Sequence, residues 1–466
     1  MFKALQMFSY ASFFLSTTVF FIQLAESVTK VGDVEYWSRD DISNYKNKTI
    51  TIMNSCYKKC GVEYGVPKLY KYTLENVLCN DGTPATYYYA KSPKSRRWIV
   101  FLDGGGFCST VEECHKRANK SIRFVSSKKN SNRVEGNGIL EMTYDNSNMF
   151  WRSNMIYIPY CSSDMYLGNT HKASVAGYHF MGSQIVMKTI MELINHGMGT
   201  KKNTQLFLTG SSAGGIGVLA NIDRIAMKLK RMKKGNIIVR GIVDSAWYLP
   251  LAKTCSMSQK NCLTESGMKK AMHAWRGRYP QYCNQKNVNC LYGVSSVQHI
   301  KSPLFIIQNQ FDIEQMALKG IWPPDNYEKL ARLKEVGEEV RKQITYENGV
   351  KAFFLSSCMG HNLLSVKSFH KVAFVKISEN TDVAHYKSLE SALSCWIKNT
   401  FYNSSIVIRS EHNSLNYSRY DCSMRLSDTS YCTSPNCNEY CEHMPNFERR
   451  FGRLSSNLKH FSKSRK

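Results

Sequence analysis

The chain has 466 residues, of which 43% are hydrophobic, and a formal net charge of +26 at pH 7. This hydrophobic content excludes a globally disordered chain, and the length suits one large α/β domain with insertions or two domains. Such a charge indicates a nucleic-acid partner in a cytosolic protein, whereas in an exported protein it indicates sulfated glycosaminoglycans or acidic membrane surfaces.

Residues 1–27 have the features of a secretory signal peptide. Lys3 supplies the positive start, Phe13–Leu24 is mostly apolar, and Ala25-Glu26-Ser27 offers a cleavage site with small residues. The apolar core is short and interrupted by polar residues, and no later stretch reaches the length of a membrane span. We therefore expect a secreted, extracellular protein with no integral membrane segment in the mature chain and no nucleic-acid partner.

Sixteen cysteines in an exported chain indicate a disulfide framework. A zinc site is the alternative for the C-terminal cysteines, but their spacing lacks paired C-x-x-C motifs, which favours disulfides and no metal. Sequence spacing does not give the connectivity. The close sets are Cys108/Cys114, Cys255/Cys262, Cys283/Cys290 and the group Cys422, Cys432, Cys437 and Cys441. Four N-x-S/T sequons predict glycosylation at Asn47, Asn119, Asn403 and Asn416.

The chain divides into a signal peptide (1–27), a polar N-terminal extension (28–66), a catalytic domain (67–445) and a basic tail (446–466). Tyr70–Tyr89 has the pattern of a β-hairpin that turns at Cys79–Gly82. Short apolar runs typical of buried strands follow, separated by helical patterns. The predicted strands are Trp98–Leu102, Met155–Pro159, Gln205–Leu208, Ile237–Val243, Leu304–Ile307 and Ala352–Leu355, and the clearest helices are Val186–His196 and Ile216–Leu229.

Strands that alternate with helices predict a mostly parallel sheet covered on both faces. With the motifs below, the expected fold is an α/β-hydrolase-like sheet flanked by helices and stabilised by disulfides. Gly320–Gly349 is rich in charge and helical in pattern, so we expect an insertion near the site. The cysteine-rich segment beyond Trp396 is expected to be pinned to the main body by disulfides.

A glycine-rich turn follows the strand Trp98–Leu102, with the sequence Asp103-Gly104-Gly105-Gly106-Phe107-Cys108. Consecutive glycines allow backbone N–H groups to converge on one point, as an oxyanion hole requires. Gly105 and Gly106 are the candidates, together with Ala213. The alternative is a flexible loop without a catalytic role.

The stretch Gln205–Asn221 combines a buried strand, the pattern Gly210-Ser211-Ser212-Ala213-Gly214 and a helix. This order is typical of a nucleophile elbow, in which the central serine is exposed at the top of a sheet. Ser212 is then the nucleophile, and the N–H of Ala213 points toward the developing oxyanion. A serine- and glycine-rich loop with no chemistry is the alternative.

A serine nucleophile needs a base, and the base needs an orienting carboxylate. In α/β-hydrolases these residues follow the serine in the order acid, then histidine, each after a strand. Asp312 follows the strand Leu304–Ile307 and His361 follows the strand Ala352–Leu355, so both occur in this order. Glu314 is the alternative acid, but it lies further from the strand end.

Several separate motifs together resemble the pectinacetylesterase family, over about Tyr70 to Glu442. They are Gly210-Ser211-Ser212-Ala213-Gly214-Gly215, Ile158-Pro159-Tyr160-Cys161-Ser162-Ser163-Asp164, Phe180-Met181-Gly182, Val243-Asp244-Ser245, Asn289-Cys290 and the cysteines from Cys422 to Cys441. The resemblance is strongest to the Wnt-deacylating branch of the family. It implies a secreted serine carboxylesterase that removes the O-linked palmitoleoyl group from lipidated Wnt proteins and antagonises Wnt signalling, with no cofactor.

The resemblance assigns the triad to Ser212, Asp312 and His361 and the oxyanion hole to Gly105, Gly106 and Ala213. It also implies affinity for glypican heparan sulfate, which agrees with the basic runs at Lys91–Arg97, Lys228–Lys234 and Arg449–Lys466. The residues that match the family's acyl pocket are Phe107, Tyr248, Met268, Leu291 and Tyr292, although ordinary core positions would have the same character.

The chain has Gly106 and Leu291 where Wnt-deacylating members have aromatic residues, which predicts a reshaped pocket mouth. Two other functions remain as alternatives. The first is an O-acetylesterase for a pectin-type polysaccharide, and the second is a non-catalytic protein that sequesters ligands on heparan sulfate.

Overall fold

The computed structural model describes residues 68–142, 148–170, 172–173, 177–250, 264–283, 287–345, 350–367, 369–378, 385–405, 423–428, 434–438 and 440–441. Several predictions lie outside these residues: the signal peptide, the N-terminal extension, the basic tail, and the residues Cys255, Cys262, Cys422, Cys432, Asn47 and Asn416. The side chain of Asn403 also lies outside them.

A ten-stranded sheet has the strand order β12-β9-β8-β7-β6-β3-β5-β2-β1-β4. From β12 to β5 in this order neighbouring strands run parallel, whereas β2, β1 and β4 are joined antiparallel. The strands are β1 Lys68–Leu78, β2 Pro84–Ala90, β3 Arg97–Leu102, β4 Arg133–Glu135, β5 Asn154–Ile158, β6 Thr204–Ser211, β7 Ile237–Asp244, β8 Leu304–Asn309, β9 Phe353–Ser356 and β12 Arg425–Ser427; β10 Phe374–Ser378 and β11 His385–Ser388 form a separate pair.

The predicted mostly parallel sheet and its hairpin are confirmed. β1 and β2 pair antiparallel with Tyr70 opposite Tyr89, so the sequence pattern located both strands and the turn between them. The central strand β6 runs beyond the predicted Leu208 to Ser211, because it pairs on both sides and its last pair joins Ser211 to Asp244. The parallel strands therefore carry the elbow to the carboxyl edge of the sheet.

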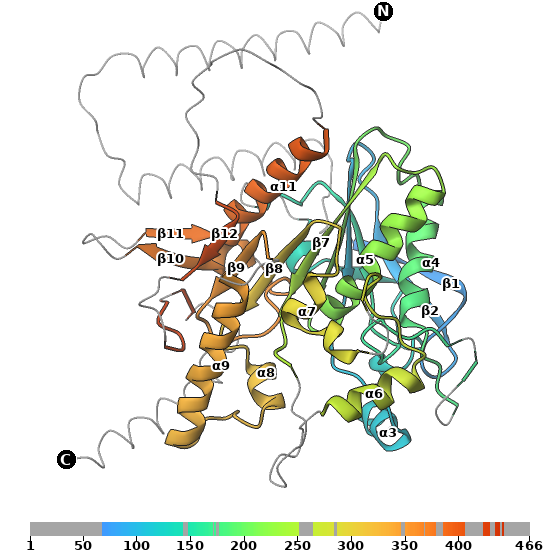
Figure 1. Cartoon of the computed structure of the whole chain (residues 1–466). Helices are drawn as coiled ribbons and strands as arrows, with labels where there is room; N and C mark the ends of the chain where they lie inside the picture. Colours follow the sequence, from blue (N-terminus) through green and yellow to red (C-terminus); the bar gives the residue numbers. More distant parts are fainter. Residues whose placement is uncertain are drawn as a thin grey trace, which may run out of the picture. The chain divides into compact units, whose positions relative to one another are not determined.

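Helices cover both faces of the sheet (Figure 1). The helices α4 and α5 lie side by side on one face, and α11 packs on the other through Trp396, whose ring lies 5.5 Å from that of Phe305. The helices are α3 Val111–Lys120, α4 Gly182–Asn195, α5 Ala213–Arg231, α6 Glu265–Ala274, α7 Gly293–Val297, α8 Ile313–Leu318, α9 Tyr327–Thr345, α10 Phe369–Val372 and α11 Leu389–Ser405, with short 3-10 turns at η1 Ile122–Phe124, η2 Gly138–Leu140 and η3 Val288–Leu291.

The core follows the two-residue period of the strands. In β3, Trp98, Val100 and Leu102 belong to the apolar cluster under α4 and α5, while Ile99 and Phe101 belong to the cluster under α11. Both faces of this strand are therefore buried, which explains why it reads as a continuous apolar run. The charged segment predicted to be helical contains α9, whose buried Val340 and Ile344 pack on the α5 side.

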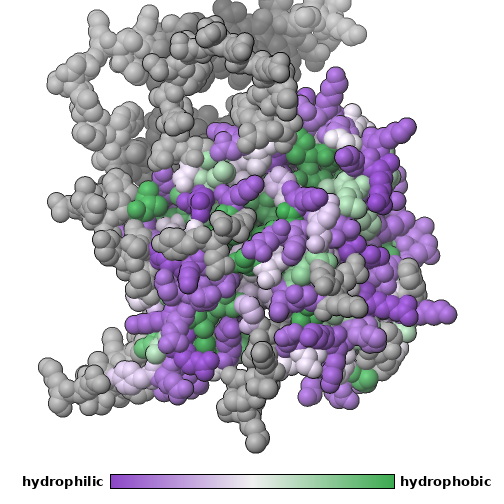
Figure 2. Space-filling model, viewed as in Figure 1, coloured by the Kyte–Doolittle hydropathy of each residue, from purple (hydrophilic) through white to green (hydrophobic). Residues whose placement is uncertain are grey.

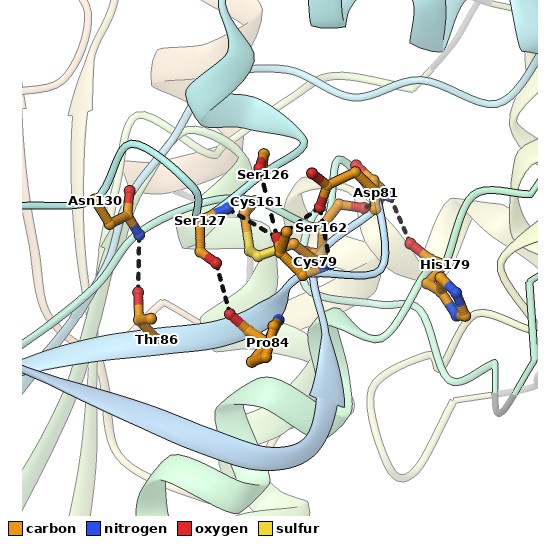
Figure 3. The surroundings of a disulfide bond; sticks show 12 residues. Cys79, Asp81, Pro84, Thr86, Ser126, Ser127, Asn130, Cys161, Ser162 and His179 are labelled. Carbon is orange, nitrogen blue, oxygen red and sulfur yellow. Dashed lines mark hydrogen bonds between the residues drawn. A yellow bond between two sulfur atoms is a disulfide. The ribbon is translucent and has the colours of Figure 1, made fainter.

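Disulfides join distant parts of the described chain. Cys108–Cys114 and Cys283–Cys290 confirm two of the close sets, and spacing did not predict Cys79–Cys161 or Cys358–Cys441. Figure 3 shows the disulfide Cys79–Cys161, which ties the hairpin turn to the loop after β5. The N–H of Asn80 also donates a hydrogen bond of 2.9 Å to the carbonyl oxygen of Cys161. A crosslink that closes a loop of this size stabilises a fold by about 4 kcal/mol.

The disulfide Cys358–Cys441 fastens the C-terminal cysteine segment to the loop that carries His361. This is the pinning to the main body that the sequence predicted. Cys437 is disulfide-bonded as well, which favours the disulfide interpretation of the C-terminal group over zinc. A thiolate is the species that ligates zinc, and a disulfide sulfur does not supply it.

Hydrophilic side chains dominate the face shown in Figure 2, where hydrophobic ones form small separate patches. Within the described residues, no helix combines the length and the apolar character needed to cross a bilayer.

Candidate active site

The predicted catalytic residues meet at one edge of the sheet. β6, β7, β8 and β9 are consecutive neighbours in parallel orientation, so their carboxyl ends lie side by side. Ser212 follows β6, Asp312 lies three residues beyond β8, and His361 lies in the loop after β9. Functional residues of open α/β sheets occur at this edge because the loops there can vary without disturbing the core.

Ser212 occupies a strained turn between β6 and α5. Its backbone has φ 57° and ψ −122°, a conformation that residues with a side chain rarely adopt. Gly214 permits this turn, because a Cβ there would lie 2.1 Å from the carbonyl oxygen of Leu102. A sharp, strained strand-to-helix turn is the geometry of a nucleophile elbow.

His361 and Asp312 form the most direct contact of the site. His361 Nδ1 lies 2.8 Å from Asp312 Oδ2, and the two side chains are 8% and 1% exposed. Asp312 Oδ1 accepts hydrogen bonds from the N–H groups of Glu314 and Gln315, because Asp312 is the N-cap of α8. The alternative acid, Glu314, is exposed in the first turn of α8, so Asp312 is the carboxylate that orients the imidazole.

Opposing effects set the pKa of His361. Burial is the largest and lowers the pKa, but the charge of Asp312 and its hydrogen bond, followed by the charges of Glu314 and Asp244, raise it above its usual value. With Nδ1–H donated to Asp312, Nε2 is the nitrogen left to accept a proton from serine.

The raised pKa of His361 predicts the acid limb of the pH profile. A general base must be neutral, so kcat/KM for an ester should fall as the pH drops through this pKa, with a midpoint above the ordinary imidazole value of about 6.5. Glu314→Gln removes one of the negative charges that raise the pKa of His361. The midpoint should therefore move to lower pH, with little change in the plateau rate. A midpoint that stays in place in this variant would contradict the assignment of the limb to His361.

The hydroxyl of Ser212 is close to the phenol of Tyr248. Burial and the charge of Asp312 raise the pKa of that phenol, and a hydrogen bond with the side chain of Ser212 opposes the rise. Between the described side chains of Ser212 and His361 there is no hydrogen bond in this structure. Catalytic hydrogen bonds in ligand-free sites are often long and shorten when substrate binds.

Asp244, at the end of β7, joins the elbow to the histidine loop. Asp244 Oδ2 accepts hydrogen bonds from Ser211 Oγ at 2.6 Å and from the N–H of Leu364 at 2.8 Å. Its Oδ1 accepts from Ser245 Oγ, which in turn accepts from the N–H of Asn362. Burial raises the pKa of Asp244, and these hydrogen bonds oppose the rise. The sequence motifs predicted no role for Asp244, although its position at the end of a buried strand could have indicated one.

The glycine turn lies directly against the elbow. A Cβ on Gly104 would lie 2.7 Å from Ser211 O and 3.1 Å from the Cβ of Ser212. Among the described residues, the N–H groups of Gly105, Gly106 and Ala213 donate to no other group of the protein. Free N–H donors next to a nucleophile are what an oxyanion hole requires.

The five candidate acyl-pocket residues share one apolar region. Met268 on α6 and Leu291 and Tyr292 at η3 are buried in the cluster under α4 and α5, and Phe107 and Tyr248 pack against it. Phe107 meets the ring of the buried Trp275 edge-on, at 5.4 Å. Ordinary core residues belong to the same cluster, so the acyl pocket stays a prediction.

One group of potential metal ligands occurs in the described residues. Atoms of Cys283, Cys290 and His299 lie within 4.8 Å of one another. The two sulfur atoms form a disulfide, so they do not provide the thiolates that a metal would need.

The fold is that of an α/β-hydrolase, and this edge of the sheet carries a serine, a histidine and an aspartate, the residue types of a serine-hydrolase triad. The profile of the pectinacetylesterase family matches residues 61–438, and the chain belongs to this family of esterases.

Within this family the chain is similar to two named relatives and to one protein of known structure. The palmitoleoyl-protein carboxylesterase NOTUM of Mus musculus is 32% identical over 377 residues, which cover 78% of this chain and 70% of the relative. The palmitoleoyl-protein carboxylesterase notum1a of Danio rerio is 32% identical over 86% of this chain and 78% of its own. The structure of the Wnt deacylase Notum from Drosophila superposes with a TM-score of 0.67 at 31% identity, covering 80% of this chain and 99% of that one.

Proposed function

We propose that this chain is a secreted serine carboxylesterase that removes the O-linked palmitoleoyl group from lipidated Wnt proteins and thereby antagonises Wnt signalling. The observation that supports the catalytic part is the contact of 2.8 Å between His361 Nδ1 and Asp312 Oδ2, at the edge of the sheet where Ser212 lies in its strained turn. The substrate part is supported by relatives named palmitoleoyl-protein carboxylesterases.

The proposed reaction proceeds through an acyl-enzyme. Ser212 Oγ attacks the ester carbonyl carbon while His361 Nε2 takes the serine proton, and Asp312 holds the imidazolium. The tetrahedral intermediate collapses, the bond to the substrate's serine oxygen breaks, and His361 returns the proton to that oxygen. A water molecule, deprotonated by His361, then cleaves the acyl-enzyme and releases the free fatty acid.

The remaining candidate residues have supporting roles in this proposal. The N–H groups of Gly105, Gly106 and Ala213 stabilise the oxyanion of both tetrahedral intermediates. The apolar region of Phe107, Tyr248, Met268, Leu291 and Tyr292 receives the acyl chain, and each methylene that it buries contributes about 0.8 kcal/mol of binding.

Incubation with a palmitoleoylated Wnt peptide tests the substrate. We expect stoichiometric release of palmitoleate, detected by mass spectrometry, and faster hydrolysis of medium-chain than of acetyl p-nitrophenyl esters. An acetylated pectin-type polysaccharide is the parallel substrate. Release of acetate from the polysaccharide without release of palmitoleate would contradict the proposal and support a polysaccharide O-acetylesterase. Hydrolysis of neither ester would support a non-catalytic protein that sequesters ligands on heparan sulfate.

Export of the protein is part of the proposal. The disulfides of the described chain fit an oxidising compartment, as does the leader predicted from the sequence. Asn119 is exposed on α3, which makes this sequon available for glycosylation.

Binding to the heparan sulfate of glypicans is the second partner proposal. A surface cavity of about 520 Å³ between α4 and α5 is lined by one acid, Glu75, and by five cationic residues, Lys188, Arg224, Lys228, Arg231 and Arg278. Burial lowers the pKa of Arg224, and repulsion by the charge of Arg278 lowers it further. A polyanion would relieve this repulsion.

Retention on a heparin column measures this binding. The double variant Lys228→Gln/Arg231→Gln should elute at distinctly lower salt, because each lost contact reduces the number of counterions released. The control is Lys334→Gln/Lys342→Gln on α9, where three glutamates share the same surface. Equal elution of both double variants would contradict a role for the cavity between α4 and α5.

A further inference from the structure

Arg117, on α3, is a partly buried cation beside the glycine turn. Its Nη1 lies 3.6 Å from the position that a Cβ on Gly106 would occupy. Its Nε donates a hydrogen bond of 2.7 Å to Ser163 Oγ, while its Nη2 is buried and has no hydrogen-bond partner among the described residues. Arg117 also forms no ion pair with any residue that the structure describes.

An unpaired guanidinium in such a place is costly, because burial removes water without a carboxylate to replace it. Burial accordingly lowers the pKa of Arg117, as does the charge of Arg123, although the phenol of Tyr160 opposes them. Buried polar atoms without partners are rare in folded proteins and call for an explanation. Arg117 is neither a member of the candidate triad nor a donor of the candidate oxyanion hole.

The position of Arg117 relative to the glycine turn is fixed by several contacts. Its guanidinium stacks on Phe124 at 4.2 Å and lies 5.6 Å from the ring of Tyr160. The Ser163 hydroxyl that accepts from Arg117 donates to the carbonyl of Phe124. The disulfide Cys108–Cys114 joins α3 to the end of the turn. The cation is therefore preorganised and does not need to move during a reaction.

Arg123 provides an internal comparison. It stacks on the same Phe124 ring, also at 4.2 Å, but it is paired with Asp103 at 3.0 Å and its side chain is 56% exposed. Water and Asp103 screen its charge, whereas no carboxylate neutralises that of Arg117. Although both arginines stack on the ring of Phe124, we expect Arg117 to produce the stronger positive electrostatic field at the glycine turn.

We propose that Arg117 stabilises the tetrahedral oxyanion electrostatically, as a fixed positive charge behind the N–H groups of the glycine turn. This inference rests on the proposed function, since it needs an oxyanion to form at Gly105 and Gly106. Arg117 acts through its field and does not contact the reacting atoms. Because the negative charge exists only in the transition state and intermediate, the effect should appear in kcat and not in KM.

Steady-state hydrolysis of a neutral p-nitrophenyl ester by the full chain tests the inference. Arg117→Gln should lower kcat by about 10- to 100-fold and leave KM within about threefold, whereas Arg117→Lys should retain most of the rate. Ser163→Ala removes the hydrogen-bond partner but keeps the charge, and Arg123→Gln removes the screened cation. Both controls should stay within about threefold of the wild-type kcat.

A boronic acid gives a second readout that a structural defect does not reproduce. Its serine adduct carries a formal negative charge like the intermediate, so its affinity should fall in Arg117→Gln by the same factor as kcat/KM. Binding of an uncharged ether analogue of the substrate should not change.

Three results would overturn the inference. They are an unchanged kcat in Arg117→Gln, a loss of kcat in Arg117→Lys or Ser163→Ala as large as the loss in Arg117→Gln, and an effect confined to the KM of a carboxylate-bearing ester, which would make Arg117 a substrate anchor. If the Gln variant does not fold, the Lys variant and the Ser163 control decide between charge and structure. A wild-type chain that hydrolyses no ester overturns the proposed function itself, which the Arg117 variants alone cannot do.

Discussion

Replacement of Ser212 with alanine is expected to lower kcat/KM for an ester by about 10⁴- to 10⁶-fold while the protein remains folded. The hydroxyl is the only atom removed, and without it no acyl-enzyme can form. Hydrolysis of a p-nitrophenyl ester and covalent labelling by a fluorophosphonate both measure the loss. Neither should be detectable above background in the variant.

The backbone of Ser212 adds a stability test. Its φ of 57° and ψ of −122° strain any residue with a Cβ, and glycine relieves this strain. Ser212→Gly should therefore be as inactive as Ser212→Ala but more stable than it by about 1 kcal/mol in urea unfolding. Ser211→Ala is the neighbouring control, since it loses the hydrogen bond to Asp244 and keeps the nucleophile. Substantial esterase activity in Ser212→Ala would remove Ser212 from the mechanism.

Asp312→Asn is expected to lower kcat by about 10³- to 10⁴-fold. Asp312 accepts hydrogen bonds on both oxygens, from His361 on Oδ2 and from the N–H groups of Glu314 and Gln315 on Oδ1. An amide has one oxygen, so its NH₂ must face either the imidazole or the start of α8. The first orientation selects the wrong tautomer of His361, and the second weakens the N-cap by about 1 kcal/mol.

Glu314→Gln is the matched control for Asp312→Asn. Glu314 lies two residues away on the same helix and is exposed, so its loss should change the plateau kcat less than about threefold. Stopped-flow measurement of the acylation burst separates the first chemical step from deacylation in both variants. A larger loss in Glu314→Gln than in Asp312→Asn would mean that the acid has been assigned to the wrong residue.

Local patterns located most of the fold and the core of the candidate site. The elbow is encoded by contiguous residues, since a strand, the pattern Gly210-Ser211-Ser212-Ala213-Gly214 and a helix follow one another directly. The close approach of Leu102 O, on β3, to Gly214 is in contrast a tertiary contact. Asp312 and His361 were predicted because each follows a strand in an order that the sheet topology then places at one edge. Asp312 is the N-cap of α8, and hydrogen bonds from the N–H groups of Glu314 and Gln315 hold its carboxylate in place.

The pairings of distant residues could not be read from spacing. Cys79 and Cys161 are 82 residues apart, and Cys358 and Cys441 are 83 apart, so only the packing of the hairpin and of the C-terminal segment brings them together. The link from Asp244 to the histidine loop joins residues 120 positions apart. In each case the tertiary fold brings together residues that are far apart in the chain.

The sequence by itself determined the fold class, the nucleophile elbow and the order of the candidate triad, because the strand period, the G-x-S-x-G pattern and the polar residues after strands are local properties. The tertiary structure decided which charges face the site. In the folded chain Asp244 links the elbow to the histidine loop through hydrogen bonds. Arg117 lies beside Gly106 without an ion pair to any described residue, whereas Arg123 forms an ion pair with Asp103. Burial and pairing depend on what other segments bring near a side chain, so only the folded chain assigns them.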